Sequence, residues 1–148
     1  MGTNIKEFNK NLKAFANTLV PQQVVVAQKK IALELFTRII VKTPVDTGRA
    51  RGNWQITIGA PATGVIETKG SSKGPFSSPP PIGPGAGQGA LTKGSKKVES
   101  VKGFVTIYIT NNVDYIVYLE QGGDVGSDQA PNGMVAVSIE EVNAGLFI

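Results

Sequence analysis

The stretch VVVAQKKIALELFTRIIVKTPVDTGRARGNWQITI, residues 24–58, contains the change of periodicity that decides the fold. Residues 24–42 carry apolar side chains in a broad stripe, with the spacing of a helix that packs on two sides. A residue that precedes proline is driven out of the helical region, so we expect the helix to end before Thr43-Pro44. Apolar and polar residues then alternate over 54–58, which predicts a half-buried strand. A long helix followed by a strand indicates an α+β protein.

The segments on either side of this stretch complete the predicted fold. Residues 4–19 repeat apolar side chains at steps of three and four, which predicts an amphipathic helix before the long one. Residues 65–69 are predicted to form a short return strand, and the β-branched and aromatic run at 104–110 a central strand. Residues 115–121 suit a short helix. The pattern at 134–142 fits a strand or a helix, and the glycines that bracket it favour the helix.

We therefore expect a single domain over residues 1–148, in which long N-terminal helices pack on a small antiparallel β-sheet, with a short C-terminal helix and a long arm. The arm is predicted from composition: residues 70–98 contain seven Gly, five Pro and five Ser, so 17 of these 29 positions avoid regular structure. None of this segment is expected in the core. A solvated loop without a function is the alternative.

The predicted arm is basic, because it carries four lysines and no acid. These lysines are candidate contacts to a neighbouring subunit or to the phosphates of DNA: Lys73, Lys93, Lys96 and Lys97. The arm has a single aromatic residue, Phe76, so it is poorly equipped to stack the bases of a single strand.

Histidine and cysteine are missing from the 148 residues, which limits the chemistry. Without them there is no imidazole base, no thiolate nucleophile and no zinc or iron–sulfur site of the usual kind. The acids show no metal-ligand spacing, so no catalytic, cofactor or metal site is predicted. No segment has the apolar length of a signal peptide or a membrane span, so a soluble chain without membrane contact is expected.

The charges are divided unevenly along the chain. Residues 1–102 hold all 15 basic residues and five acids, whereas residues 103–148 hold six acids and no basic residue. Two interpretations stay open at this point. The acidic part folds over the basic part of its own chain, or it contacts the basic part of a neighbouring subunit.

Asp46-Thr47-Gly48 spells the triplet of aspartic proteases, in which two carboxylates share a proton across a dimer. That triplet should follow an apolar strand, whereas here it follows the end of a long helix. The favoured interpretation is structural: Asp46 caps the next turn and Gly48 supplies a special backbone angle. Next to this turn, Arg49 and Arg51 flank a small residue and precede Trp54. Arginines beside a tryptophan are typical of an interface, so these three residues are candidate subunit contacts.

Two motifs resemble a known family. The run VKTPVDTGRARGNW at residues 41–54 resembles the TPVDTGRLR-S-W signature of a tail-component or neck protein family of long-tailed bacteriophages, related to the minor tail protein Z group. The run NNVDYIVYLEQG at residues 111–122 is similar to that family's second element, in the same order along the chain. The resemblance implies an α+β subunit without enzymatic activity that assembles into a ring. In a head-to-tail ring the acidic part of one subunit would face the basic part of the next, which adds Tyr115, Tyr118 and Glu120, in and beside the predicted short helix, to the candidate subunit contacts.

The function expected from this resemblance is that of a structural virion protein, assembled in the host cytoplasm. It would form a ring oligomer, a hexamer or a dodecamer, at the head–tail junction (neck or tail completion) through which DNA passes. Its partners would be copies of itself, other connector, head-closure or tail proteins, and DNA in the channel. The alternative is a basic nucleic-acid-binding module that uses the lysines of the arm.

Overall fold

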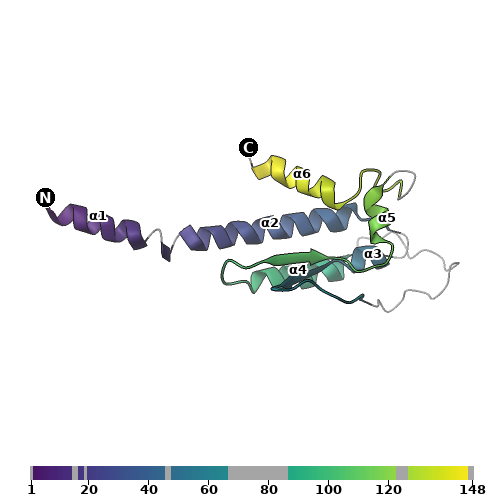
Figure 1. The fold of residues 1–148 in the computed structure, drawn as a ribbon, viewed down its shortest axis with the longest axis horizontal. Helices are drawn as coiled ribbons and strands as arrows, with labels where there is room; N and C mark the ends of the chain where they lie inside the picture. Colours follow the sequence, from purple (N-terminus) through teal and green to yellow (C-terminus); the bar gives the residue numbers. More distant parts are fainter. Residues whose placement is uncertain are drawn as a thin grey trace.

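The computed structural model describes residues 2–14, 17–18, 20–45, 48–66, 87–122 and 127–146, and it has an α+β fold (Figure 1). The described residues form helices and a two-stranded sheet in the following order: α1 (Gly2–Ala14), α2 (Val20–Lys42), α3 (Arg49–Gly52), β1 (Gln55–Ile58), α4 (Gln88–Glu99), β2 (Ile107–Thr110), α5 (Ile116–Gln121) and α6 (Val135–Leu146). The predicted fold class is confirmed, and α6 confirms the helical interpretation of the C-terminal segment.

The core is built around α2, the 23-residue helix that the apolar stripe predicted. Its side chains Phe36, Ile39 and Ile40 are 0–1% exposed and lie in one cluster with Trp54 and Met134. α4 packs against α2 and against β1, and α6 packs against α2 (Figure 1). The helix ends at Lys42, before the proline, as expected.

The sheet is antiparallel, with Ile56 opposite Ile109 and Ile58 opposite Ile107. Residues that face each other across two strands lie on the same face of the sheet, so these isoleucines share the face toward the helices. The prediction of a central strand over 104–110 is wrong in extent, because β2 begins at Ile107. It also has only β1 beside it within the described residues.

The predicted return strand at 65–69 is not formed by its first two residues, and 67–69 lie outside the described residues. Asn53 explains this outcome. Its side-chain oxygen accepts from the amide of Ile66 at 2.6 Å, and its side-chain nitrogen donates to the carbonyl of Ile66 at 3.0 Å. Both backbone groups of Ile66 are thus bonded to a side chain, where a strand would need a neighbouring backbone.

The prediction that 70–98 forms an arm without core residues is wrong for its last third, which is α4. Ala90, Gly94 and Val98 recur every four residues and are buried. A Cβ atom on Gly94 would lie 2.3 Å from Cε1 of Phe36, so the glycine permits a close contact between α4 and α2. Gly94, which counted toward a loop in the composition, is therefore a packing residue. Residues 67–86, including Lys73, lie outside the described residues.

Figure 1 shows an elongated molecule in which α1 extends away from the body formed by the other helices and the sheet. Three of the apolar residues that predicted α1 lie on one face of the helix but do not enter the core. Ile5, Phe8 and Leu12 are 67%, 64% and 52% exposed. Of the two N-terminal helices, only α2 packs into the body that contains the sheet.

Candidate subunit interface

Trp54 lies in the core. Its indole nitrogen donates to the hydroxyl of Thr43 at 2.7 Å, and that hydroxyl donates to the carbonyl of Ile39 at 2.6 Å. Trp54 is 5% exposed and Thr43 is 0% exposed. Trp54 therefore offers almost no indole surface that a neighbouring subunit could touch.

Arg51 binds the C-terminal end of α2. Its guanidinium donates to the carbonyl of Thr43 at 2.9 and 2.6 Å and to that of Val41 at 3.0 Å. A cation is favourable here because the last carbonyls of a helix have no helical donor. Partial burial lowers the pKa of Arg51 below its usual range. The side chain thus ties the turn to α2 within one subunit.

The two motifs that carry the family resemblance form one structural unit. The side-chain amide of Asn111 donates to the carbonyl of Ala50 at 2.8 Å, across 61 residues of sequence. The guanidinium of Arg49 lies 3.6 Å from the carboxylate of Asp114 and 5.9 Å from the ring centre of Tyr115. Gly48, with φ at 78°, begins the short helix that positions Arg49. The glycine interpretation of the Asp-Thr-Gly triplet is confirmed, whereas Asp46 lies outside the described residues.

Glu120 caps α6. Its carboxylate accepts from the backbone amides of Met134 and Val135 at 2.9 Å and of Ala136 at 3.0 Å. These amides have no acceptor within the helix, and a negative charge is favourable at this end of it. Glu120 therefore joins α5 to α6 inside the subunit. Gly122 permits the same approach, because a Cβ atom there would lie 2.3 Å from the carbonyl oxygen of Pro131.

Three of the six predicted contact residues, Arg51, Trp54 and Glu120, are thus engaged inside the subunit. The other three belong to a surface at the end of the molecule where α3 and α5 lie (Figure 1). Tyr118 and Val117 are 60% and 62% exposed there. We call this surface the α5 patch and define it by Arg49, Asp114, Tyr115, Val117 and Tyr118.

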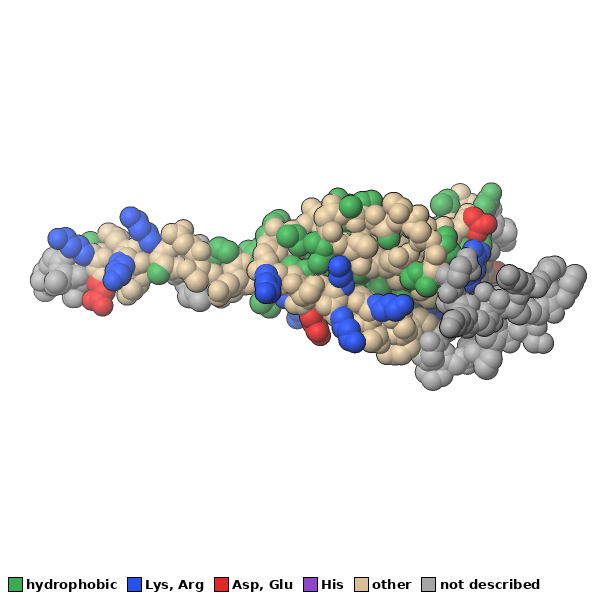
Figure 2. All heavy atoms as spheres, turned by 90° about the horizontal axis from the view of Figure 1, so that it is seen from below, with side chains coloured by type: hydrophobic (Ala, Val, Ile, Leu, Met, Phe, Trp, Pro, Cys, Tyr) green, Lys and Arg blue, Asp and Glu red, His purple; other side chains and the backbone are tan. Residues whose placement is uncertain are grey.

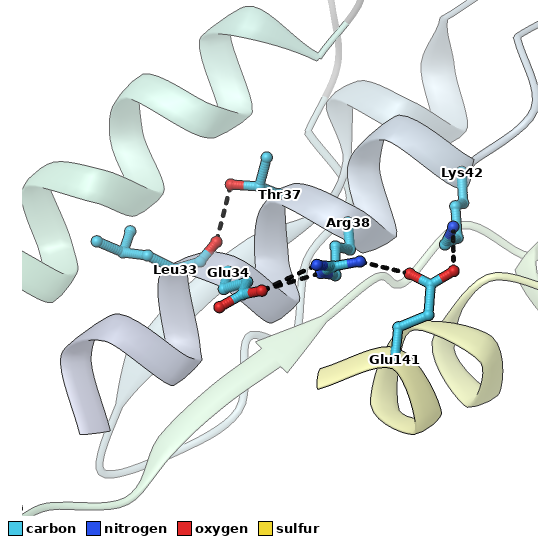
Figure 3. A network of polar contacts seen from close by, with 6 residues as sticks. All are labelled: Leu33, Glu34, Thr37, Arg38, Lys42 and Glu141. Atoms are coloured by element: carbon cyan, nitrogen blue, oxygen red, sulfur yellow. Dashed lines mark hydrogen bonds and ion pairs between the residues drawn. The ribbon is translucent and has the colours of Figure 1, made fainter. Parts of the chain in front are cut away.

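Part of the acidic C-terminal region forms ion pairs with basic residues of the same chain. Glu141 of α6 bonds Arg38 at 2.7 Å and Lys42 at 2.9 Å, and Arg38 also bonds Glu34 at 2.9 Å (Figure 3). Lys42 first and then Arg38 hold the pKa of Glu141 below its usual range, and the two glutamates raise the pKa of Arg38. The intramolecular interpretation is thus correct for Glu141, whose pairing across 103 residues of sequence was not predicted individually.

Lysines that were assigned to the arm lie on the outer face of α4. Lys93, Lys96 and Lys97 are exposed and, at spacings of three and four, share one side of the helix. Figure 2 shows basic side chains gathered over this part of the molecule, with few acidic ones between them. These three lysines are called the α4 lysines below.

An apolar groove that sequence reasoning missed lies between α2 and β2, with a volume of about 420 Å³. It is lined by Val24, Ala27, Gln28, Ile31, Ala32, Leu35, Phe104, Ile107 and Ile109. The exposed Phe104, which sits before β2, is one wall of it. The signal available in the sequence was the N-terminal half of the α2 stripe, which extends beyond the core residues.

Over the part of the chain that the structure describes, no three acidic side chains converge as metal ligands. The described helices include none with the length and apolarity of a membrane span. In comparisons with known proteins, no family model, no curated protein and no solved structure matches this chain.

Proposed function

We propose that this chain is a non-enzymatic structural protein of a tailed bacteriophage virion, which forms a ring at the head–tail junction through which DNA passes. The proposal rests first on the two sequence motifs that resemble the neck and tail-component family. Their residues bond one another in the fold, through Asn111 to Ala50 and Arg49 to Asp114. Two motifs that meet in this way support a shared fold better than two separate matches do.

The observation that carries the assembly part is the distribution of exposed apolar side chains. Within the described residues, neighbouring ones occur at two different places, on α1 with the start of α2 and on α5, and the others lie singly, at Val41, Val65, Phe104 and Ile139. A contiguous apolar surface left in water is typical of a contact site. Two unlike contact surfaces on one subunit favour head-to-tail association, which closes into a ring where the rotation allows it.

The test is the particle formed by the purified full-length chain. We expect native mass spectrometry and negative-stain electron microscopy to show closed rings. Tyr118→Ser should weaken the assembly, or its binding to neighbouring connector proteins, because it removes the exposed aromatic side chain of Tyr118 from the α5 patch. Thr92→Ser on the exposed face of α4 is the matched control. A chain that stays monomeric at all concentrations, also with connector proteins present, contradicts the proposal.

The α4 lysines favour a second candidate function, the binding of nucleic acid through its phosphates. Three cations on one exposed helical face could each neutralise a phosphate of a duplex. Such binding is independent of base sequence and weakens steeply with salt. It is also compatible with a ring that surrounds DNA.

This second function is tested by replacing the α4 lysines together with glutamine. The affinity for duplex DNA should fall, and the slope of log affinity against log salt should decrease by about 2.7, since each lost phosphate contact contributes about 0.9. The control is the triple variant Lys6→Gln, Lys10→Gln and Lys13→Gln, which removes the same charge from α1. Equal losses in both variants would show non-specific attraction and reject the α4 face.

A further inference from the structure

The apolar face of α1 has no partner within the described part of its own chain. Ile5, Phe8 and Leu12 are more than half exposed and follow one another at steps of three and four. This is the anchor spacing with which an amphipathic helix binds an apolar groove. A 13-residue helix is marginally stable in water by itself, so α1 gains stability from a surface that covers this face.

The groove between α2 and β2 is complementary to such a helix. Gln28 is its single polar lining residue; the other eight are apolar. Along α2 the lining runs from Val24 to Leu35, about 16 Å at the rise of a helix, whereas the anchors Ile5 to Leu12 span about 10 Å. The groove is therefore long enough to receive all three anchors.

We propose that the groove of each subunit binds α1 of a second copy of this chain. In the structure α1 extends beyond the start of α2 and away from the body, so it does not lie in its own groove (Figure 1). The inference rests on the self-assembly part of the proposed function and names the segment that makes the contact. The contact is separate from the α5 patch, which lies at the other end of the subunit.

The size of the contact fits an assembly in which each subunit makes two such contacts, one through its α1 and one through its groove. α1 has 13 residues and the groove is lined by nine, whereas a standard specific interface takes roughly 20–30 residues from each partner. One contact is thus about half of standard size. Because each subunit supplies both an α1 and a groove, it takes part in two contacts, and closure of the assembly holds both in place.

The first experiment uses disulfide cross-linking, for which a chain without cysteine is well suited. Phe8→Cys is mixed with Val24→Cys, and in a second mixture with Ile31→Cys, and each mixture is oxidised mildly. A heterodisulfide can join only two different chains, and intact mass identifies it. We expect it with both groove variants and not with Thr92→Cys, which places the thiol on the exposed face of α4.

The second experiment compares Phe8→Gln with Lys10→Gln, which place the same residue on the apolar and on the basic face of α1. Sedimentation should show self-association weakened about tenfold or more by Phe8→Gln, because a large apolar side chain is no longer buried on assembly. Lys10→Gln should leave self-association unchanged. Both side chains are exposed, so the isolated subunit should unfold at the same temperature as the unaltered one.

The possible results separate this inference from the proposed function. Rings without either heterodisulfide overturn the α1 contact and leave the ring intact, whereas a monomer at all concentrations overturns both. A disulfide within a single chain that carries both Phe8→Cys and Ile31→Cys assigns the groove to the subunit's own α1. Monomers that bind anionic phospholipid vesicles through Phe8 assign α1 to a lipid surface. Either of the last two results also overturns the inference.

Discussion

At the scale of single residues, the polar side chains of the two motifs, at 41–54 and 111–122, form hydrogen bonds that hold the fold together. Thr43 bonds Trp54 and Ile39, Arg51 bonds the end of α2, and Glu120 caps α6. A buried donor left without its acceptor costs the full desolvation of that group. Replacing the polar residues of either motif should therefore lower the stability of the fold, whether or not these residues also take part in an interface.

Thr43→Val is expected to lower the free energy of unfolding by about 1–3 kcal/mol, because it leaves the buried indole N–H of Trp54 without an acceptor. Thr37→Val is the matched control, since Thr37 makes the same bond to the carbonyl four residues earlier but on the exposed side of α2. Chemical denaturation measures both. Equal effects of the two changes would show that the Trp54 bond adds nothing.

Glu120→Gln is expected to destabilise the fold by about 0.5–2 kcal/mol, the range for a lost helix cap. The substitution places an amide NH₂ where the α6 amides need an acceptor and removes the charge that favours this end of the helix. Glu140→Gln, on the exposed side of the same helix, serves as control in the same denaturation experiment. A cost no larger than that of the control would contradict the capping role.

At the scale of elements, the contact between α4 and α2 depends on the absence of a side chain at Gly94. Gly94→Ala brings a Cβ atom 2.3 Å from Phe36, which is fully buried. Overpacking costs about 1–3 kcal/mol and should exceed the gain of about 1 kcal/mol in helix propensity. Gly89→Ala on the same helix meets nothing within 4 Å and should be neutral or stabilising. Thermal unfolding that ranks the two variants in the opposite order would disprove this packing.

The attachment of α6 to α2 is expected to depend on pH through Glu141. Its pKa is lower in the folded chain than in the unfolded one, so its stabilising effect is present above the unfolded pKa and is lost as the pH falls through the folded pKa. Glu141→Gln should lower the unfolding temperature at pH 7, and the difference should disappear in acid. Glu140→Gln, on the exposed side of the same helix, is the control. A difference that persists in acid would mean that the charge of Glu141 is not its cause.

At the scale of the whole molecule, the elongated chain exposes unlike apolar surfaces on α1, in the groove and on the α5 patch. Association that buries them stabilises the folded subunit by mass action. The unfolding temperature should therefore rise with protein concentration. The rise should be smaller for Phe8→Gln, which weakens the proposed contact of α1. Scanning calorimetry over a hundredfold range of concentration measures this, and a constant temperature for the unaltered chain would argue against assembly.

The elements that sequence reasoning predicted are those with a local signal. α2 and β1 follow from their own periodicity, α6 follows from the glycines that bracket an ambiguous pattern, and the end of α2 follows from Pro44. α4 was missed because Gly87, Gly89 and Gly94 weaken the helix signal locally, and the small size of Gly94 makes sense only against Phe36 of another helix. Local propensity is a weak guide where tertiary packing selects the residue.

The candidate contacts divide in the same way. Sequence reasoning selected Arg49 and Tyr118, which lie at the surface, together with Trp54 and Glu120, which have partners inside the subunit. The type of a residue, whether arginine, aromatic or carboxylate, does not tell whether it lies in an interface or has its partners inside its own chain. Only its partners distinguish the two roles, and those partners are not its sequence neighbours.

The sequence by itself determined the class of the fold, the long central helix with its end at the proline, and a chain without histidine or cysteine chemistry. The tertiary structure alone decided that the glycine-rich segment contributes a packed helix, that Glu141 meets Arg38 and Lys42, and that an apolar groove opens beside α2. The physical reason is distance along the chain. Periodicity and proline act over a few residues, whereas burial and pairing join groups that tens of residues separate.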